Sequence, residues 1–284
     1  MTGRLNGIID RLERDDRVFA TFVSPDPSAA ISVRGADYDG LIFEAEHKPW
    51  DVPALRDAMQ YLLDRRTVHN ADGLTPAITP LVRIPPNGGE RAQWHAKQAL
   101  DLGAYGIVWP HVDTVEDARN AVAACRYPGV HQDASREPLG LRGDSPAWAA
   151  RYWGVSVDEY YERADVWPLA PKGEILVALM IESVRAIENL PAMLEQVPGI
   201  GLILVGEGDL SQELGIPRQF EHPDMLAHHR RVVDICRDHG VPVGHPHVTA
   251  SNVDDVLERG YQFLMTAPVT TYPGLERGRA ATDR

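Results

Sequence analysis

Cysteine and long apolar runs are scarce in this chain of 284 residues. It has only two cysteines, Cys125 and Cys236, which cannot form a disulfide framework and are expected to be buried free thiols. No run of about eighteen apolar residues occurs, which argues against a transmembrane helix. Residues 1–16 are charged and amphipathic and contain no apolar signal core. These absences predict a soluble, cytoplasmic protein.

Excess positive charge is also missing, because 41 acidic residues oppose 28 lysines and arginines and leave a net charge of −13. Such a surface repels phosphate, so we expect no nucleic acid and no membrane as a partner. An acidic protein can still bind an anionic small molecule through a metal ion and a few arginines. The length suits one large domain, and we expect residues 1–284 to form it.

The chain does contain a regular alternation of short apolar runs and segments with helical periodicity, which is typical of parallel βα proteins. Eight runs are expected to be strands: 18–23, 40–46, 79–85, 106–112, 175–183, 201–206, 241–248 and 261–267. Eight βα units favour a single (β/α)8 TIM barrel over a doubly wound sheet, because no glycine-rich dinucleotide turn follows the first run. Residues 128–173 are expected to form a long excursion after the fourth strand.

Helix-end signals support this division of the chain. Three segments with clear helical periodicity are 51–66, 114–127 and 222–240. Asp51 and Thr114 are expected to be N-caps. Gly103, Gly240 and Gly260 follow helical segments, at positions that favour a left-handed residue.

Carboxylates follow two neighbouring strands in the second half of the chain. The reactive residues of such barrels stand at the C-terminal ends of the strands. Glu182 ends the fifth run and Asp209 follows the sixth, so their carboxylates can converge on one ion. Two carboxylates with open water positions suit a hard divalent cation such as Mg²⁺ or Mn²⁺, and Co²⁺ also fits. The alternative is that both are loop or cap carboxylates without a ligand.

The second and third strands end in further polar residues. Arg83 ends the third run, and its guanidinium could bind a keto oxygen or a developing enolate. His47 follows Glu44 and Glu46, and it could act as a general base if a carboxylate such as Asp101 orients it. The alternatives are a structural ion pair for Arg83 and a surface or capping role for His47.

Lysine occurs only three times, at Lys48, Lys97 and Lys172. Covalent Schiff-base chemistry needs a lysine that points into the barrel from a strand. Lys97 falls in a helical pattern, Lys172 precedes a strand, and only Lys48 lies near a strand end. The metal route is therefore favoured over the covalent one.

The motif His245-Pro246-His247 has the alternate spacing that places two imidazoles on one face of a strand. Some zinc sites use such a pair. No third ligand pattern accompanies it here, and the proline between the histidines disturbs the strand. We therefore do not expect zinc at this motif, although His245 or His247 could line a pocket.

Six motifs occur in the order found in one known family. They are DYDGLIFEAEH (37–47), PLVRIP (80–85), ALDLGAYGIVWPHVDTVEDA (99–118), RYPGV…GLRG (126–143), IES (181–183) and GEGDLSQELGIP (206–217). With these motifs the chain resembles the HpcH/HpaI aldolases of the pyruvate/phosphoenolpyruvate barrel superfamily. That group includes 4-hydroxy-2-oxoheptanedioate aldolase, 2-dehydro-3-deoxyglucarate aldolase and macrophomate synthase. Each motif is weak alone, but the ordered set is specific.

The resemblance implies a barrel that uses a divalent metal to cleave or form 3-deoxy-4-hydroxy-2-oxo acids, with pyruvate or a close 2-oxo acid and an aldehyde as products. It also implies roles by position: Glu182 and Asp209 as metal ligands with Glu44 behind them, Arg83 at the keto oxygen, His47 and Asp101 as a base dyad, and the turn of Gly206, Glu207, Gly208 and Asp209 as the carboxylate site. A homo-oligomer is implied as well, with a trimer-based hexamer expected.

The sequence departs from the family pattern at several of these positions. Glu44 replaces a shorter acid, Glu207-Gly208 stands where Pro-Ala is usual, and Met180 stands where many members have glutamine. Trp109 and His111 replace smaller or apolar residues after the fourth strand, and Trp109 is expected to contact the substrate. These differences leave a second reaction open with the same metal enolate. It is decarboxylation of a 2-oxo diacid, or cleavage of a CoA thioester as in citrate lyase beta subunits.

Overall fold

The computed structural model describes residues 3–70, 73–85, 93–129, 137–266 and 273–282. Nine strands occur within these ranges: β1 (Val18–Val23), β2 (Gly40–Glu44), β3 (Thr79–Arg83), β4 (Gly106–Trp109), β5 (Val166–Trp167), β6 (Ile175–Ile181), β7 (Leu202–Val205), β8 (Val243–His245) and β9 (Phe263–Thr266). The same ranges contain thirteen helices: α1 (Gly7–Glu13), α2 (Pro27–Val33), α3 (Val52–Leu62), α4 (Arg65–Asn70), α5 (Gln93–Asp101), α6 (Val115–Ala124), α7 (Ala147–Trp153), α8 (Val157–Arg163), α9 (Val184–Gln196), α10 (Glu207–Glu213), α11 (Pro223–His239), α12 (Val253–Glu258) and α13 (Pro273–Thr282).

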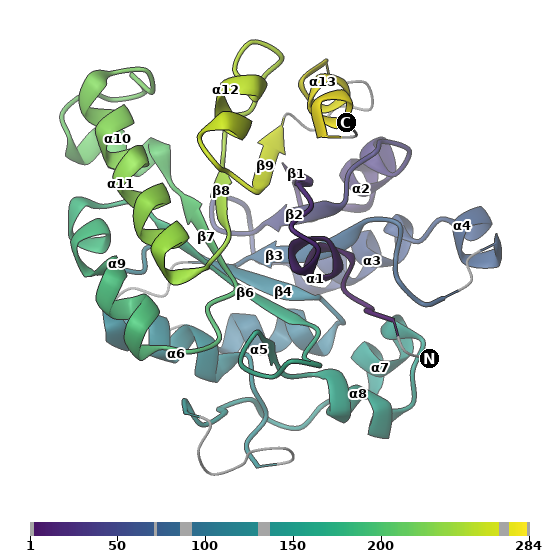
Figure 1. Cartoon of the computed structure of the whole chain (residues 1–284). Helices are drawn as coiled ribbons and strands as arrows, with labels where there is room; N and C mark the ends of the chain where they lie inside the picture. Colours follow the sequence, from purple (N-terminus) through teal and green to yellow (C-terminus); the bar gives the residue numbers. More distant parts are fainter. Residues whose placement is uncertain (1–2, 71–72, 86–92, 130–136, 267–272, 283–284) are drawn as a thin grey trace.

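Eight of these strands close into a parallel barrel. Their order is β4-β3-β2-β1-β9-β8-β7-β6, and the pairing of β4 with β6 closes the ring. The two-residue strand β5 is an addition that pairs with the first residues of β6. Helices surround the strands (Figure 1). The predicted (β/α)8 TIM barrel is therefore confirmed.

The strands are apolar because both of their faces are covered. All residues of β2, β4, β6, β7 and β9 are buried, as expected for a parallel sheet enclosed by helices. The predicted run 40–46 is longer than β2 because Glu46 and the residue before it leave the sheet after Glu44. The ends of the strands therefore deliver polar side chains to one end of the barrel.

Local sequence signals set the helix ends. The Asp51 side chain accepts a hydrogen bond from the backbone N–H of Ala54 at 2.9 Å and caps α3. Thr114 and Asp117 form a reciprocal capping box at the start of α6. The three glycines expected after helices all have positive φ: Gly103 (104°), Gly240 (65°) and Gly260 (95°). These expectations are confirmed.

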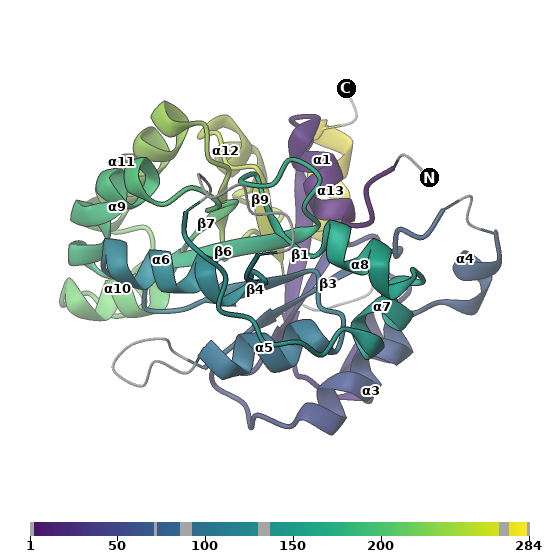
Figure 2. The ribbon, with the colours of Figure 1, turned by 90° about the horizontal axis from the view of Figure 1, so that it is seen from below.

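Helix α1 covers the end of the barrel at which the strands begin (Figure 1, Figure 2). The Asn6 side chain donates hydrogen bonds to the carbonyl oxygens of Tyr105 and Glu174, both at 3.0 Å, and these residues precede β4 and β6. The side chains of Ile8 and Ile9, both in α1, are fully buried. The opposite end, where the strands finish, is therefore the end left for chemistry.

A buried ion pair joins the two sides of the excursion after β4. Arg126, just after α6, has a fully buried side chain that binds Asp165 through two hydrogen bonds of 2.6 and 3.0 Å. It also donates to the carbonyl oxygen of Pro138 at 2.6 Å.

In the described ranges, no helix is both long enough and apolar enough to cross a membrane.

Candidate active site

Acidic and basic side chains gather at the C-terminal ends of β2, β3, β4 and β6. Glu44 and Arg83 are the last residues of β2 and β3 and are paired in register. Glu182 follows β6, and Asp209 lies in the first turn of α10, which follows β7. Barrel closure thus brings together the residues that the sequence placed at strand ends.

Glu182 is the most deeply buried carboxylate of this group, with 4% exposure. Its Oε1 accepts a hydrogen bond from the backbone N–H of His111 at 2.7 Å. Burial raises the pKa of the Glu182 carboxyl to about 7, and the nearby charges of Glu46 and Asp209 also raise it. Three carboxylates therefore repel one another at this end of the barrel.

This donor set fits a hard divalent cation. Asp209 is solvent-exposed, so it leaves room for water ligands beside the buried Glu182. Oxygen ligands with open water positions are what Mg²⁺ and Mn²⁺ prefer. A cation between the two carboxylates would also cancel the repulsion that raises the pKa of Glu182.

Arg83 pairs with two acids, one at the end of β2 and one just after it. Its guanidinium pairs with Glu44 and lies 3.0 Å from Glu46 Oε2. It also lies over the Phe22 ring, 4.5 Å from the centroid, and contacts the Met180 sulfur at 3.6 Å. Its buried Nε has no hydrogen-bond partner in the described part of the chain. Arg83 is thus fixed in position, with one donor unused.

His111 and Glu46 belong to the site although no role was assigned to either from the sequence. His111 Nε2 lies 3.3 Å from Glu46 Oε1, and its Nδ1 lies 3.8 Å from Glu182 Oε1. The interaction with Glu46 raises the pKa of His111 to about 9, helped by the charge of Glu182. His111 has a left-handed φ of 52°, unusual for a non-glycine residue. Polar residues just past apolar runs were the only sequence signal for this pair.

His47 and Asp101 are not joined in the described structure. The His47 ring is 65% exposed and lies 3.6 Å from Glu46 Oε2, while its backbone N–H donates to Glu44 Oε1 at 3.1 Å. Asp101 ends α5 and pairs with Arg142 at 3.0 Å. Within one chain, Glu46 is therefore the carboxylate beside His47, in place of the expected Asp101.

Trp109 does not line the site. Its side chain is fully buried, and its indole lies close to the Cys125 thiol, just after α6. An outward-pointing residue of β4 packs between the barrel wall and the helices. The expected substrate contact of Trp109 is therefore not seen, and His111, two residues later, lies beside Glu46 and Glu182 instead.

Glu207, in the turn expected to bind a carboxylate, directs its side chain elsewhere. It is 3% exposed and bonds His247, with His229 and His245 also beside it. Burial alone would raise the pKa of Glu207, but the interactions with His229 and His247 lower it to about 2. Only the backbone of residues 206–208 is therefore left to face a ligand.

Comparisons with known proteins agree with this geometry. Residues 19–268 match the profile of the HpcH/HpaI aldolase/citrate lyase family. The chain is 30% identical to the hydroxypyruvate/pyruvate aldolase of Roseobacter denitrificans over 268 residues, 94% of this chain and 92% of that one. It is 33% identical to the 2-keto-3-deoxy-L-rhamnonate aldolase of Salmonella schwarzengrund over 235 residues, 81% and 73% of the two chains.

A solved structure has the same fold. The HpcH/HpaI aldolase/citrate lyase family protein from Burkholderia cenocepacia J2315 superposes with a TM-score of 0.75 at 26% identity, and the match covers 98% of each chain. Profile, sequence and fold thus point to the same family over nearly the whole length. The chain belongs to the HpcH/HpaI aldolase/citrate lyase family, and it is a carbon–carbon lyase.

Proposed function

We propose that this protein is a metal-dependent aldolase that reversibly cleaves a 4-hydroxy-2-oxo acid to pyruvate, or a close 2-oxo acid, and an aldehyde. The observation that carries the proposal is the buried Glu182 carboxylate, whose pKa is raised in part by Asp209 and by Glu46, the carboxylate that Arg83 contacts. The names of two relatives, a hydroxypyruvate/pyruvate aldolase and a 2-keto-3-deoxy-L-rhamnonate aldolase, support the substrate class.

Glu182 and Asp209 would hold the cation, which we expect to be Mg²⁺ or Mn²⁺, with Co²⁺ as a substitute. A bound divalent cation polarises a keto group and stabilises the enolate charge that develops as the carbon–carbon bond breaks. Glu44 would support the site without binding the ion, because its carboxylate pairs with Arg83.

Arg83 would bind the substrate's keto oxygen through the guanidinium edge that carries its unused Nε donor. The substrate carboxylate would face the turn formed by Gly206, Glu207 and Gly208. The backbone N–H groups of the first helical residues of α10 have no partner inside the helix. The Glu207 charge does not oppose this binding, because its side chain faces the histidines.

His47 is the proposed general base for the substrate's 4-hydroxyl proton, and Glu46 is positioned to orient it. This assignment keeps the base expected from the sequence and replaces Asp101 as its partner. His111 lies on the other side of Glu46 and would hold this carboxylate in place. The His47→Ala variant should therefore lose cleavage and keep its fold, because its ring is mostly exposed.

The test is pyruvate release from a panel of 4-hydroxy-2-oxo acids, measured with Mn²⁺ or Mg²⁺ and again after chelation with EDTA. We expect release that requires the metal and is lost in the Asp209→Asn variant. Oxaloacetate belongs in the same panel. Decarboxylation of oxaloacetate without any aldehyde release would replace the aldolase proposal with the decarboxylase alternative, and full activity in excess EDTA would remove the metal from either.

A further inference from the structure

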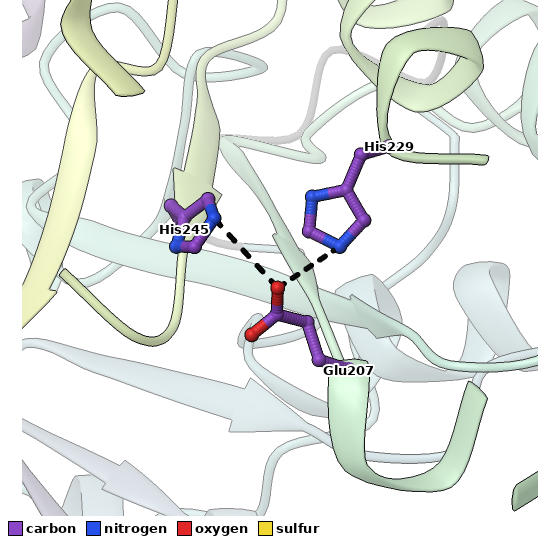
Figure 3. Close-up of side chains that lie close together, drawn as sticks. All are labelled: Glu207, His229 and His245. Atoms are coloured by element: carbon purple, nitrogen blue, oxygen red, sulfur yellow. Dashed lines mark ion pairs between the residues drawn. The ribbon is translucent and has the colours of Figure 1, made fainter. Parts of the chain in front are cut away.

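A second cluster of ligand-type side chains lies between β8, α10 and α11 (Figure 3). Glu207 begins α10, His229 lies in α11, and His245 ends β8. Their side chains are 3%, 1% and 6% exposed. Figure 3 shows all three side chains pointing toward one another. The folded chain thus supplies the further ligands that sequence spacing did not reveal beside His245.

Two separations within this cluster are close to those of a coordination shell. Glu207 Oε1 lies 3.2 Å from His229 Nε2 and 3.7 Å from His245 Nε2. One oxygen and two nitrogens bound to Zn²⁺ at about 2.0–2.1 Å in a tetrahedron would be about 3.3–3.4 Å apart. Direct charge-assisted hydrogen bonds would be shorter, at about 2.7–2.9 Å. All three ligand atoms lie within 4.8 Å of one another, close enough for one ion to bridge them.

The other atoms of these groups already have partners. His229 Nδ1 bonds the Tyr261 hydroxyl at 2.7 Å, which orients the ring, and Nε2 has no hydrogen-bond partner in the described ranges. The second oxygen of Glu207 bonds His247, which leaves Oε1 for the cluster. Partners of this kind orient the ligands of metal sites in proteins.

We propose that Glu207, His229 and His245 form a second metal site, distinct from Glu182 and Asp209, for a borderline divalent cation of the Zn²⁺ type. Two histidines and a carboxylate are an established zinc ligand set that leaves a fourth position for water. Imidazole ligands also disfavour Mg²⁺. His245 Nδ1 now accepts a hydrogen bond from the backbone N–H of His247 at 3.2 Å. Coordination through Nε2 moves the ring proton to Nδ1 and breaks this contact.

A cation there would join three elements at the end of the barrel that carries the chemistry. Glu207 is two residues from Asp209 in the first turn of α10, so the ion would fix the turn that presents Asp209. A cavity of about 360 Å³ is lined in part by His229, the member of the cluster that lies in α11, and by its partner Tyr261. The second site would thus stabilise the first without taking part in its reaction.

Cobalt distinguishes the two sites in the intact wild-type protein. Co²⁺ in a tetrahedral or five-coordinate site with imidazole ligands absorbs visible light far more strongly than octahedral Co²⁺ among carboxylates and water. We expect the chelator-stripped protein to develop this strong absorption with one equivalent of Co²⁺, and Zn²⁺ to displace it. Absence of the strong band would overturn the proposal, and this result needs no variant.

Variants assign the ligands. The Asp209→Asn protein should still retain about one equivalent of Zn²⁺ after gel filtration, as measured by elemental analysis. His229→Gln and His245→Gln should each lower Zn²⁺ affinity at least about tenfold. The matched control is His228→Gln, the neighbouring histidine of α11 that lies outside the cluster, which should bind zinc as the wild type does. Wild-type zinc binding in both His229→Gln and His245→Gln would contradict the proposal, and a variant that fails to fold leaves the cobalt spectrum to decide.

Discussion

The Glu182 carboxylate packs directly against the Cα of Gly206. A methyl group at position 206 would lie 2.6 Å from Glu182 Cβ and 3.0 Å from its Cδ. The backbone does not require glycine here, because the φ of Gly206, −99°, is one that any residue can adopt. The close approach of the Glu182 side chain is what requires it. The end of β6 and the start of α10 are thus fitted together around one carboxylate.

The Gly206→Ala substitution should displace Glu182 and damage the metal site. We expect the free energy of unfolding to fall by about 1–3 kcal/mol, since a methyl group is forced into a packed contact. Metal-dependent activity should fall at least about tenfold, because a ligand moves. Gly208→Ala is the matched control for stability: nothing lies within 4 Å of a Cβ there, and chemical denaturation should show no loss. Equal stability of the two variants would show that the contact does not matter.

The Glu182 carboxyl should make a destabilising contribution to the metal-free protein that grows as the pH rises from about 4.5 to 7, while the lowered pKa of His245, about 4, acts in the opposite direction. The pKa of Glu182 is about 7 in the folded protein and near 4.5 when unfolded. In that window the unfolded chain has lost the proton and the folded one keeps it, so unfolding becomes more favourable. The penalty from Glu182 above pH 7 is on the order of 3 kcal/mol.

The Glu182→Gln variant isolates this contribution, because its melting temperature should rise relative to that of the metal-free wild type as the pH increases from about 4.5 to about 8. The measurement is the melting temperature across the pH range, with and without Mg²⁺. Added Mg²⁺ should stabilise the wild type and leave the variant unchanged. The same difference between the two proteins at every pH would show that Glu182 does not titrate in this window.

Arg83→Lys should separate charge from geometry. Lysine keeps the positive charge opposite Glu44 and Glu46, so the melting temperature should change little. It cannot present a planar fork of donors to a keto oxygen, so kcat should fall about 100-fold with a smaller change in KM. Steady-state kinetics of pyruvate release measure both constants. A kcat equal to that of the wild type would place the keto oxygen elsewhere.

Removal of Arg126 should destabilise the fold strongly. The Arg126→Met variant leaves Asp165 partly buried without its cation and is expected to lose about 3–5 kcal/mol in urea denaturation. Arg14→Met is the matched control, because Arg14 pairs with Asp10 at an exposed site where such pairs contribute at most about 1 kcal/mol. Similar losses in the two variants would show that the buried pair contributes no more to the free energy of unfolding than the exposed pair.

The barrel itself could be predicted from the sequence, because its signals are local. Each barrel strand coincides with a predicted apolar run, and the caps Asp51 and Thr114 act where they were expected. The two-residue strand β5 carries no periodic signal and could not be found. Predicted runs such as 40–46 extended past the C-terminal end of the strand. The chain leaves the sheet after Glu44, although the next residue, Ala45, is still apolar.

The candidate site was less predictable because it depends on side-chain direction. Glu182 and Asp209 follow from strand-end positions, but nothing in the sequence shows that Trp109 points toward the helices while His111 turns toward Glu46. The metal-type cluster was missed for another reason. His229 lies 22 residues after Glu207 and within a helix, and only the packing of α10 against α11 brings them together.

The position of α1 has a consequence for protein engineering. Residues 7–13 close the barrel at the end opposite to the candidate site, and Asn6 ties them to the backbone before β4 and β6. Substrate range can therefore be altered in the loops at one end while the other end keeps the scaffold intact. A deletion that removes this helix would take away the buried Ile8 and Ile9 and expose the apolar residues that they cover, so shortened versions of the enzyme should keep it.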